Sequence, residues 1–325
     1  MSPSRFTASP KIQLWSALTV NCLGPNFRAI VSSGARAAKY YLDDNDNDNC
    51  LSSKFSSSTM GYDSSKEQIY LVLIFAIAWN TLFLVASSIS SIFIGNISKE
   101  EAKLKRRKFD ILILSTMCIF HAVIVGPAAT WILFKSPTIS AVTTAILNFD
   151  TDYLSSSDAL RATDENVAWL SAMSAGFFLF DLGKISLWKN FDYLMIAHHT
   201  ISLFVWPTGV VTKVAVPFIL IFMSSELSSP LYQVRVIAQN TLGSKSTVTN
   251  VASLLFAIAF FIVRSWTPPF LLYAYASMRP WAHASIPLWQ RILTTSTVPL
   301  PAFLNTVWTY QIVKIAIAKC RPKQS

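Results

Sequence analysis

Long apolar stretches with few charges recur along the chain from about residue 69 onward. A helix that crosses a bilayer needs roughly 20 mainly apolar residues, and several stretches reach that length. The candidate spans cover approximately residues 69–95, 109–134, 166–188, 193–211, 214–236, 248–276 and 288–317. This pattern predicts an all-α fold, a polytopic transmembrane helical bundle with six or seven spans. The count stays open because Lys213 marks the only break between the fourth and fifth stretches.

The composition supports a membrane protein and argues against two other classes. Hydrophobic residues make up 52% of the chain and charged residues 14%, a balance unlike that of an average soluble domain. The net charge is +10, but its densest cluster, KEEAKLKRRK at 99–108, directly follows the first span, where basic residues flank a membrane. The four cysteines lack metal-ligand spacing, and no Gly-rich phosphate-binding motif occurs. We therefore expect no metal site, no cofactor and no nucleic-acid partner.

Charge asymmetry between the loops predicts the orientation of the chain. Short loops rich in Lys and Arg are retained in the cytosol. If 99–108 is cytosolic, the alternate loops with Lys189 and Lys245 lie on the same side, as does the short basic tail at 321–325. The acidic loop at 150–165 lies opposite. With seven spans, the N-terminus is then lumenal and the C-terminus cytosolic.

The first 65 residues differ from the rest of the chain. They are Ser-rich and carry basic residues, with no acid before the run DDNDNDN at 43–49. This composition is typical of a disordered lumenal tail, and also of a transit sequence that directs a protein to an organelle membrane. We expect an N-terminal segment at 1–65, a transmembrane domain at 66–320 and a cytosolic tail at 321–325.

Ionisable side chains inside the candidate spans indicate interhelical contacts or a cavity. A charge at bilayer depth costs about 2.5–3.5 kcal/mol on insertion scales, so it needs a partner, a cavity or a function. In the third span, Asp181 and Lys184 lie three residues apart on one helical face. They form either an internal ion pair that locks the bundle or the polar wall of a ligand cavity. Gly176 and Gly183 give the same helix a smooth strip for close packing.

The fifth span carries the stretch SSELSSPLYQVR at 224–235. Its residues Glu226, Ser229 and Gln233 share one helical face, and Pro230 removes the backbone donor that the Glu226 carbonyl would use. This concentration of polar groups favours either a functional cavity or a kink satisfied by neighbouring helices.

Arg264 in the sixth span repeats this arrangement, because Pro268 follows it by four residues. We expect its guanidinium to neutralise Glu226 or Asp181 across the bundle.

Two adjacent histidines, His198 and His199, interrupt the apolar stretch LMIAHHTISL. Neighbouring helical residues point about 100° apart, so the two imidazoles cannot hold one metal as an i, i+4 pair does. The chain's four histidines are also too few for a membrane di-iron site. Asp192 lies on the same face as His199, two turns before it. An imidazole beside a carboxylate serves as a general base or nucleophile, or equally as an interhelical hydrogen-bond bridge.

The order of these motifs resembles the TLC-domain family of endomembrane lipid proteins over residues 66–320. The stretches that carry the resemblance are FFLFDLGK at 177–184, FDYLMIAHHTISL at 191–203, SSELSSPLYQVR at 224–235, FFIVRSWTPPF at 260–270 and LNTVWTYQIVKIAIAKC at 304–320. Within the family, the chain is most similar to the TLC domain-containing protein 4 branch, formerly transmembrane protein 56. The resemblance implies a helical bundle around a lipid-sized cavity, usually in the endoplasmic reticulum or Golgi.

The ceramide synthases of this family suggest one activity, the transfer of a fatty acyl group from acyl-CoA to a sphingoid base. They require a histidine doublet like His198–His199 and two downstream aspartates in an HD-x-SD arrangement. Here Glu226 stands at the first acid, Ser225 replaces the preceding histidine and Ser229 replaces the second acid. These departures weigh against ceramide synthesis itself.

We interpret the chain as an integral endomembrane protein that binds or processes lipid and contributes to membrane lipid homeostasis. If it is an enzyme, His198, His199 and Glu226 are the catalytic candidates for acyl transfer, with acyl-CoA as co-substrate. The polar lining of the cavity would comprise Asp181, Lys184, Asp192, Ser229, Gln233 and Arg264. The alternative is a non-enzymatic lipid sensor, scaffold or cargo receptor. Membrane lipids are the expected partners, and the sequence does not determine an oligomeric state.

Overall fold

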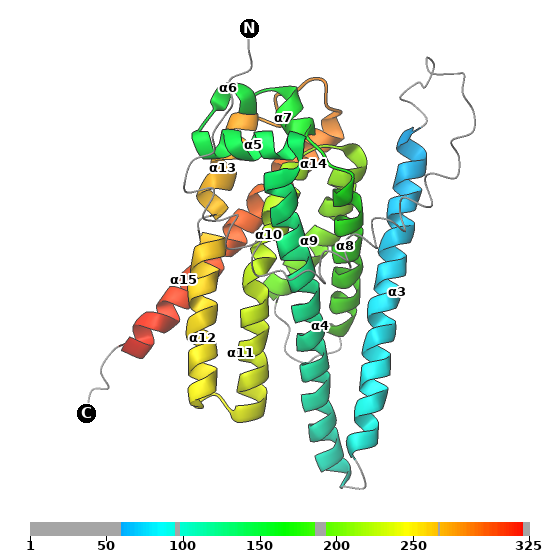
Figure 1. The fold of residues 1–325 in the computed structure, drawn as a ribbon, viewed down its shortest axis with the longest axis vertical. Coiled ribbons are helices and arrows are strands. Elements are labelled where there is room, and N and C mark those ends of the chain that lie inside the picture. Colours follow the sequence, from blue (N-terminus) through cyan, green and yellow to red (C-terminus); the bar gives the residue numbers. More distant parts are fainter. Residues whose placement is uncertain (1–59, 95–97, 186–192, 266, 321–325) are drawn as a thin grey trace. The chain divides into compact units, whose positions relative to one another are not determined.

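The computed structural model describes residues 60–94, 98–185, 193–265 and 267–320, all within the compact unit Thr59–Ser325. Every regular element in these ranges is a helix, so the fold is an all-α membrane bundle, as the apolar pattern predicts (Figure 1). Residues 1–59 and 321–325 lie outside the described ranges. The N-terminal segment and the basic tail therefore stay predictions.

Among the described residues, four helical stretches are long and apolar enough to cross a membrane: Ser65–Ser90, Glu100–Lys135, Tyr193–Thr212 and Thr247–Met278. They correspond to the first, second, fourth and sixth predicted spans. The third predicted span is one helix, α8 (Asn166–Ile185), whereas the fifth and seventh are each divided into shorter helices. The choice between six and seven spans stays open.

The first two long helices both begin before the predicted spans, at Met60 instead of about residue 69 and at Lys99 instead of about residue 109. Helix α3 (Met60–Ile94) packs against α4 (Lys99–Lys135) and α8. The basic cluster at 99–108, expected as a loop, instead forms the first turns of α4. Ser98 caps this helix by accepting a hydrogen bond from the Glu101 amide, and Glu100 and Glu101 suit the positive end of the helix dipole. The basic residues therefore extend the second helix beyond its apolar part.

Helix α8 lies between α3 and α9 (Tyr193–Thr212). A Cβ atom on Gly176 would lie 2.6 Å from the Phe75 Cβ and 2.8 Å from the Ala76 amide nitrogen, so this glycine permits the close approach of α3. Gly183 has open space at the same position. The predicted packing strip therefore applies at Gly176 and not at Gly183.

The fifth and sixth predicted spans are helices interrupted near their prolines. The fifth comprises α10 (Val216–Ser224), the 3₁₀ turn η2 (Ser225–Ser228) and α11 (Ser229–Leu242). The sixth comprises α12 (Thr247–Phe260), the π-helical turn η3 (Phe261–Ser265) and α13 (Thr267–Met278). Helices α11 and α12 form an antiparallel hairpin (Figure 1), which brings η2 and η3 into contact. The irregular turns of two spans thus meet inside the bundle.

Short helices form one end of the bundle (Figure 1). Helix α5 (Pro137–Asn148) precedes the predicted acidic loop, which contains α6 (Thr151–Leu154) and α7 (Ser157–Arg161). These three helices pack on α10 and α13. The Ala215 amide donates to the Leu160 carbonyl at 2.9 Å, and Arg161 donates to the Ser285 carbonyl at 2.9 Å. The last predicted span is divided before Pro299 into α14 (Leu288–Thr297) and α15 (Pro299–Cys320), which together contact α9.

Candidate functional site

Asp181 and His199 meet where α8 packs on α9. Nδ1 of His199 lies 2.9 Å from Oδ2 of Asp181, and only 8% and 5% of the two residues are exposed. The ring N–H does not point along this line, so the two atoms are in close contact without a well-directed hydrogen bond. Phe178 stacks on the imidazole with ring centroids 4.7 Å apart. Asp181 and Phe178 together fix the position of the His199 ring.

The second nitrogen of His199 determines what this pair can do. Among the residues that the structure describes, Nε2 forms no hydrogen bond. A carboxylate near Nδ1 favours a proton on that nitrogen and leaves the other as an acceptor. The pair can therefore receive a proton from a bound hydroxyl or amine.

The predicted ion pair between Asp181 and Lys184 does not form between these two described residues. Asp181 contacts His199, whereas Nζ of Lys184 lies 4.3 Å from the ring centroid of Phe83 and 5.5 Å from that of Phe180. A lysine one turn from an aspartate on a helix can reach either a carboxylate or a neighbouring ring. In the structure, the Asp181 carboxylate contacts His199 of α9 and not Lys184.

A second polar cluster joins η2 to η3. Nη2 of Arg264 lies 3.4 Å from Oε1 of Glu226, and the Ser229 hydroxyl donates to Oε2 of Glu226 at 2.6 Å. The guanidinium also donates to Ser229 Oγ at 3.1 Å and, through Nε, to Ser228 Oγ at 2.9 Å. Of the two predicted partners, Arg264 therefore meets Glu226. Both carboxylate oxygens of Glu226 are occupied.

The Glu226 carbonyl is not free, which corrects the prediction based on Pro230. The proline has no N–H to donate, but the backbone tightens into the 3₁₀ turn η2, where the Ser229 N–H donates to the Glu226 carbonyl.

Helix α4 packs closely against the same turn. A Cβ atom on Gly126 of α4 would lie 2.8 Å from the Leu227 amide nitrogen. The absence of a side chain at Gly126 thus lets α4 pack directly against this turn.

Trp308 of α15 lies between the two clusters. Its ring meets the His198 ring edge to face, with centroids 5.7 Å apart, and the guanidinium carbon of Arg264 lies 5.8 Å from its centroid. His198 itself is half-buried, and its centroid is 5.4 Å from that of His199. One tryptophan therefore contacts the histidine doublet and the arginine of the other cluster.

The remaining predicted residues lie outside these contacts. Asp192 falls outside the described residues. Gln233 is half-buried on α11, one turn after Ser229. His121 is buried, stacks on Phe177 with centroids 4.2 Å apart, and lies 3.3 Å from the Ser174 hydroxyl. In the part of the chain that the structure describes, no three His, Cys, Asp or Glu side chains gather as metal ligands do.

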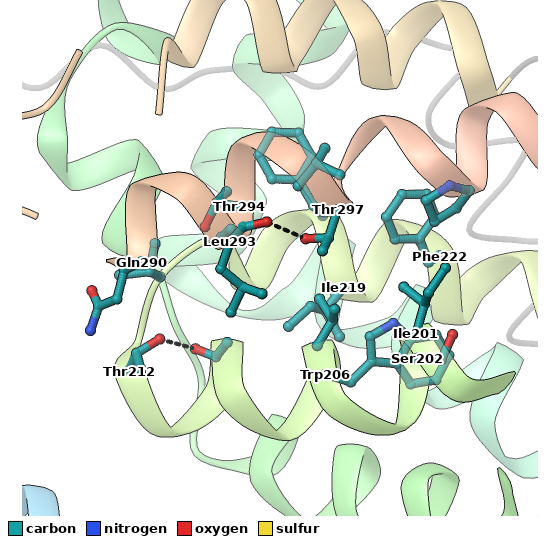
Figure 2. Close-up of a pocket in the computed structure, with 17 residues that line it drawn as sticks. Ile201, Ser202, Trp206, Thr212, Ile219, Phe222, Gln290, Leu293, Thr294 and Thr297 are labelled. Atoms are coloured by element: carbon teal, nitrogen blue, oxygen red, sulfur yellow. Dashed lines mark hydrogen bonds between the residues drawn. The ribbon is translucent and has the colours of Figure 1, made fainter. Parts of the chain in front are cut away.

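A cavity of about 30 Å³ lies beside the histidines, among residues of α9, α10, α14 and α15 (Figure 2). Its walls include Trp206, whose ring contacts Phe178 with centroids 5.0 Å apart. Phe178 thus touches both His199 and the wall of the cavity. None of the predicted site residues lines this cavity, so a lipid cavity lined by the histidines and Glu226 stays a prediction.

The sequence reasoning missed three residues that shape the site. Trp308 lies in one of the stretches that carry the family resemblance. An aromatic ring in a bundle with buried charges could have indicated a contact with one of those charges. Ser228 adjoins the predicted Ser229 and was not singled out. Phe178 gave no signal, because an apolar residue that stacks on a histidine has the same sequence pattern as any core residue.

Comparison with known families places these clusters in one domain. The family model of the TLC domain matches residues 112–314, which is more than half of the chain and includes every residue of both clusters. The chain belongs to the TLC-domain family. No curated protein matches the chain at a significant level. The family and the apolar helices together indicate an integral membrane protein related to lipids.

Proposed function

We propose that this TLC-domain protein binds or processes a membrane lipid and contributes to membrane lipid homeostasis. The observation that carries the proposal is the buried Asp181–His199 pair, which keeps an unbonded imidazole nitrogen inside an apolar bundle. Nε2 is not among the fully enclosed atoms that lack a partner, so it is accessible, and it can accept a hydrogen bond from a polar group of a ligand. Family membership supports a lipid as that ligand.

Acyl transfer is the reaction that this arrangement supports best. His199 takes a proton from the hydroxyl or amine of an acceptor lipid, whose oxygen or nitrogen then attacks the thioester carbon of an acyl-CoA. The new C–O or C–N bond replaces the C–S bond, and the proton passes from His199 to the departing thiolate. Asp181 balances the imidazolium charge. In this reaction Glu226 has a structural part, since Arg264 and Ser229 already bind its oxygens.

The second candidate is a non-enzymatic lipid sensor, scaffold or cargo receptor. The fully bonded Glu226–Arg264 cluster favours it, because that cluster resembles a fixed interhelical connection. In that case the histidines would also connect helices, and their substitution would reduce the amount of folded protein without changing any lipid.

The finer family and location assignments belong to the same proposal. The motif order supports the TLC domain-containing protein 4 branch, and the basic start of α4 supports a cytosolic position for that end of the helix. We propose an endoplasmic reticulum or related membrane, with Lys213 in a lumenal loop. A glycosylation tag inserted at Lys213 should be modified. An unmodified tag there, in a chain whose second tag at another lumenal position is modified, would argue against seven spans.

Comparative lipidomics tests the proposed function. Cells that lack the protein are complemented with wild type, with His198→Ala/His199→Ala or with Thr208→Val, at matched amounts in the membrane. Thr208 is the control because its hydroxyl donates to the Phe204 carbonyl of the same helix. We expect wild type and the control to restore a lipid class that the double variant does not. Equal restoration by all three would contradict a functional role for the histidines.

A further inference from the structure

The cavity in Figure 2 contains polar groups that the protein leaves unbonded. Ser202 and Thr294 line it and are only 2% and 8% exposed. Among the described residues, neither side-chain hydroxyl forms a hydrogen bond, and neither does the indole N–H of Trp206, which is 2% exposed. By contrast, the Thr212 and Thr297 hydroxyls donate to backbone carbonyls of their own helices. Polar groups of residues this buried usually have partners. None of these three atoms is among the fully enclosed atoms that lack a hydrogen bond, so they are accessible inside the bundle and point to a ligand.

The chemistry of the three groups restricts that ligand. The indole N–H only donates, so the ligand must offer an acceptor, whereas the Ser202 and Thr294 hydroxyls donate or accept. Every side chain that lines the cavity is uncharged. A charged headgroup would therefore lose its hydration without a counter-charge, at a large cost. A neutral hydroxyl, which both donates and accepts, satisfies the same groups.

The size and walls of the cavity are compatible with the same class of ligand. A cavity of about 30 Å³ has room for at least one water-sized polar group, so it can hold a hydroxyl. The remaining walls are apolar side chains such as Ile201, Val205 and Leu293. Phe204, next to the wall residue Val205 in sequence, is 66% exposed, which offers an apolar surface to the body of a lipid.

We infer that this cavity is a binding site for the hydroxyl group of an uncharged lipid alcohol, such as a diacylglycerol or a sterol. The site is distinct from the Asp181–His199 pair and is connected to it by Phe178, which contacts both His199 and Trp206. The inference does not depend on a reaction at His199. A lipid held here would be separated from His199 by the Trp206 and Phe178 rings, whether the protein is an enzyme or a sensor.

Photolabelling of the full-length protein in membranes tests this site. The probes are a photoreactive diacylglycerol, the phosphatidic acid with the same acyl chains, and a photoreactive sterol. The first two differ only in the phosphate that replaces the hydroxyl, so they isolate the headgroup. We expect the diacylglycerol or the sterol to label peptides of α9 and α14, and phosphatidic acid to label them at least tenfold less. Equal labelling by phosphatidic acid would overturn the inference.

Two variants remove the polar groups with little change of shape. Ser202→Ala and Thr294→Val should each weaken labelling about fivefold, the change that loss of one neutral hydrogen bond of about 1 kcal/mol produces. Thr208→Val is the matched control on α9 and should label as wild type does. Unchanged labelling of both variants, at equal amounts of folded protein, would contradict the site. A lipidome restored by these variants would leave the proposed function intact, so the two failures are distinguishable.

Discussion

The two polar clusters of the bundle use similar residue types but differ in how completely their groups are bonded. In the Glu226–Arg264 cluster, two serines complete the contacts, and both carboxylate oxygens have partners. In the Asp181–His199 pair, the contact is close but poorly directed, and neither ring nitrogen forms a hydrogen bond among the described residues. A saturated cluster stabilises a fold, whereas an unsaturated one can act on a ligand. This difference supports the different roles that we propose for the two clusters.

The largest effect is expected from Arg264→Leu, which removes the counter-charge of Glu226. An unpaired buried charge is strongly destabilising, by about 3–5 kcal/mol. The yield of monodisperse protein in detergent and the thermal unfolding midpoint should both fall sharply. Glu226→Gln in the same chain should recover part of the loss, since the unpaired charge is gone. Arg235→Leu on α11 is the control, because Arg235 contacts only the Tyr232 ring in the described structure. Wild-type stability of Arg264→Leu would refute the stabilising role.

Asp181→Asn should instead reduce activity more than stability. The amide keeps the size of the side chain but cannot balance an imidazolium, and general-base catalysis contributes about 10²–10⁴-fold to rates. We expect the lipid difference restored by wild type to be lost by at least tenfold, with the variant still folded. Quantitative lipidomics at matched expression measures this change. Full restoration by Asp181→Asn would show that the carboxylate has no part in the function.

The close contact at Gly126 gives a third, smaller effect. In Gly126→Ala, the new Cβ would lie 2.8 Å from the Leu227 backbone, so α4 must move away from η2 at a cost of about 1–3 kcal/mol. Gly183→Ala is the matched control, because the space around Gly183 is open and alanine is the better helix former. The unfolding midpoints in detergent should fall for the first variant and not for the second. The reverse order would exclude a tight contact at Gly126.

Substitution of Trp308 should have the smallest effect. It tests whether the Trp308 ring connects the two clusters. Cation–π contacts contribute about 0.5–2 kcal/mol, and the ring also packs on His198. Trp308→Ala should lower stability by about this amount and reduce lipid restoration, whereas Trp308→Phe retains a ring and should recover part of both. Equal behaviour of the alanine and phenylalanine variants would show that the ring itself does not matter.

The long helices were predicted well because a long apolar stretch is a direct sign of a membrane-spanning helix. Pro230 and Pro268 also marked the irregular turns η2 and η3. The short helices α5 to α7 were missed, since a polar segment stabilised by packing on other helices has no long apolar pattern. The basic residues at 99–108 were assigned to a loop because their helix depends on the Ser98 cap.

The contacts among the candidate residues were only partly predicted. Spacing along one helix suggested Lys184 as the neighbour of Asp181, whereas Asp192, suggested for His199, lies outside the described residues. The observed contact joins α8 to α9, and such contacts depend on how two helices pack, which spacing within one helix does not determine. The pairing of Arg264 with Glu226 was easier to predict, because a buried charge needs an opposite charge and the predicted spans contain few acidic residues.

The most direct test of these different roles compares His199→Ala with the double variant Glu226→Gln/Arg264→Met by lipidomics of complemented cells. The double variant removes both charges of the saturated cluster together and leaves the Asp181–His199 pair in place. At equal amounts of folded protein, the double variant should restore the lipid class that wild type restores, and His199→Ala should not. Restoration by His199→Ala with failure of the folded double variant would contradict the assignment and place the function at Glu226.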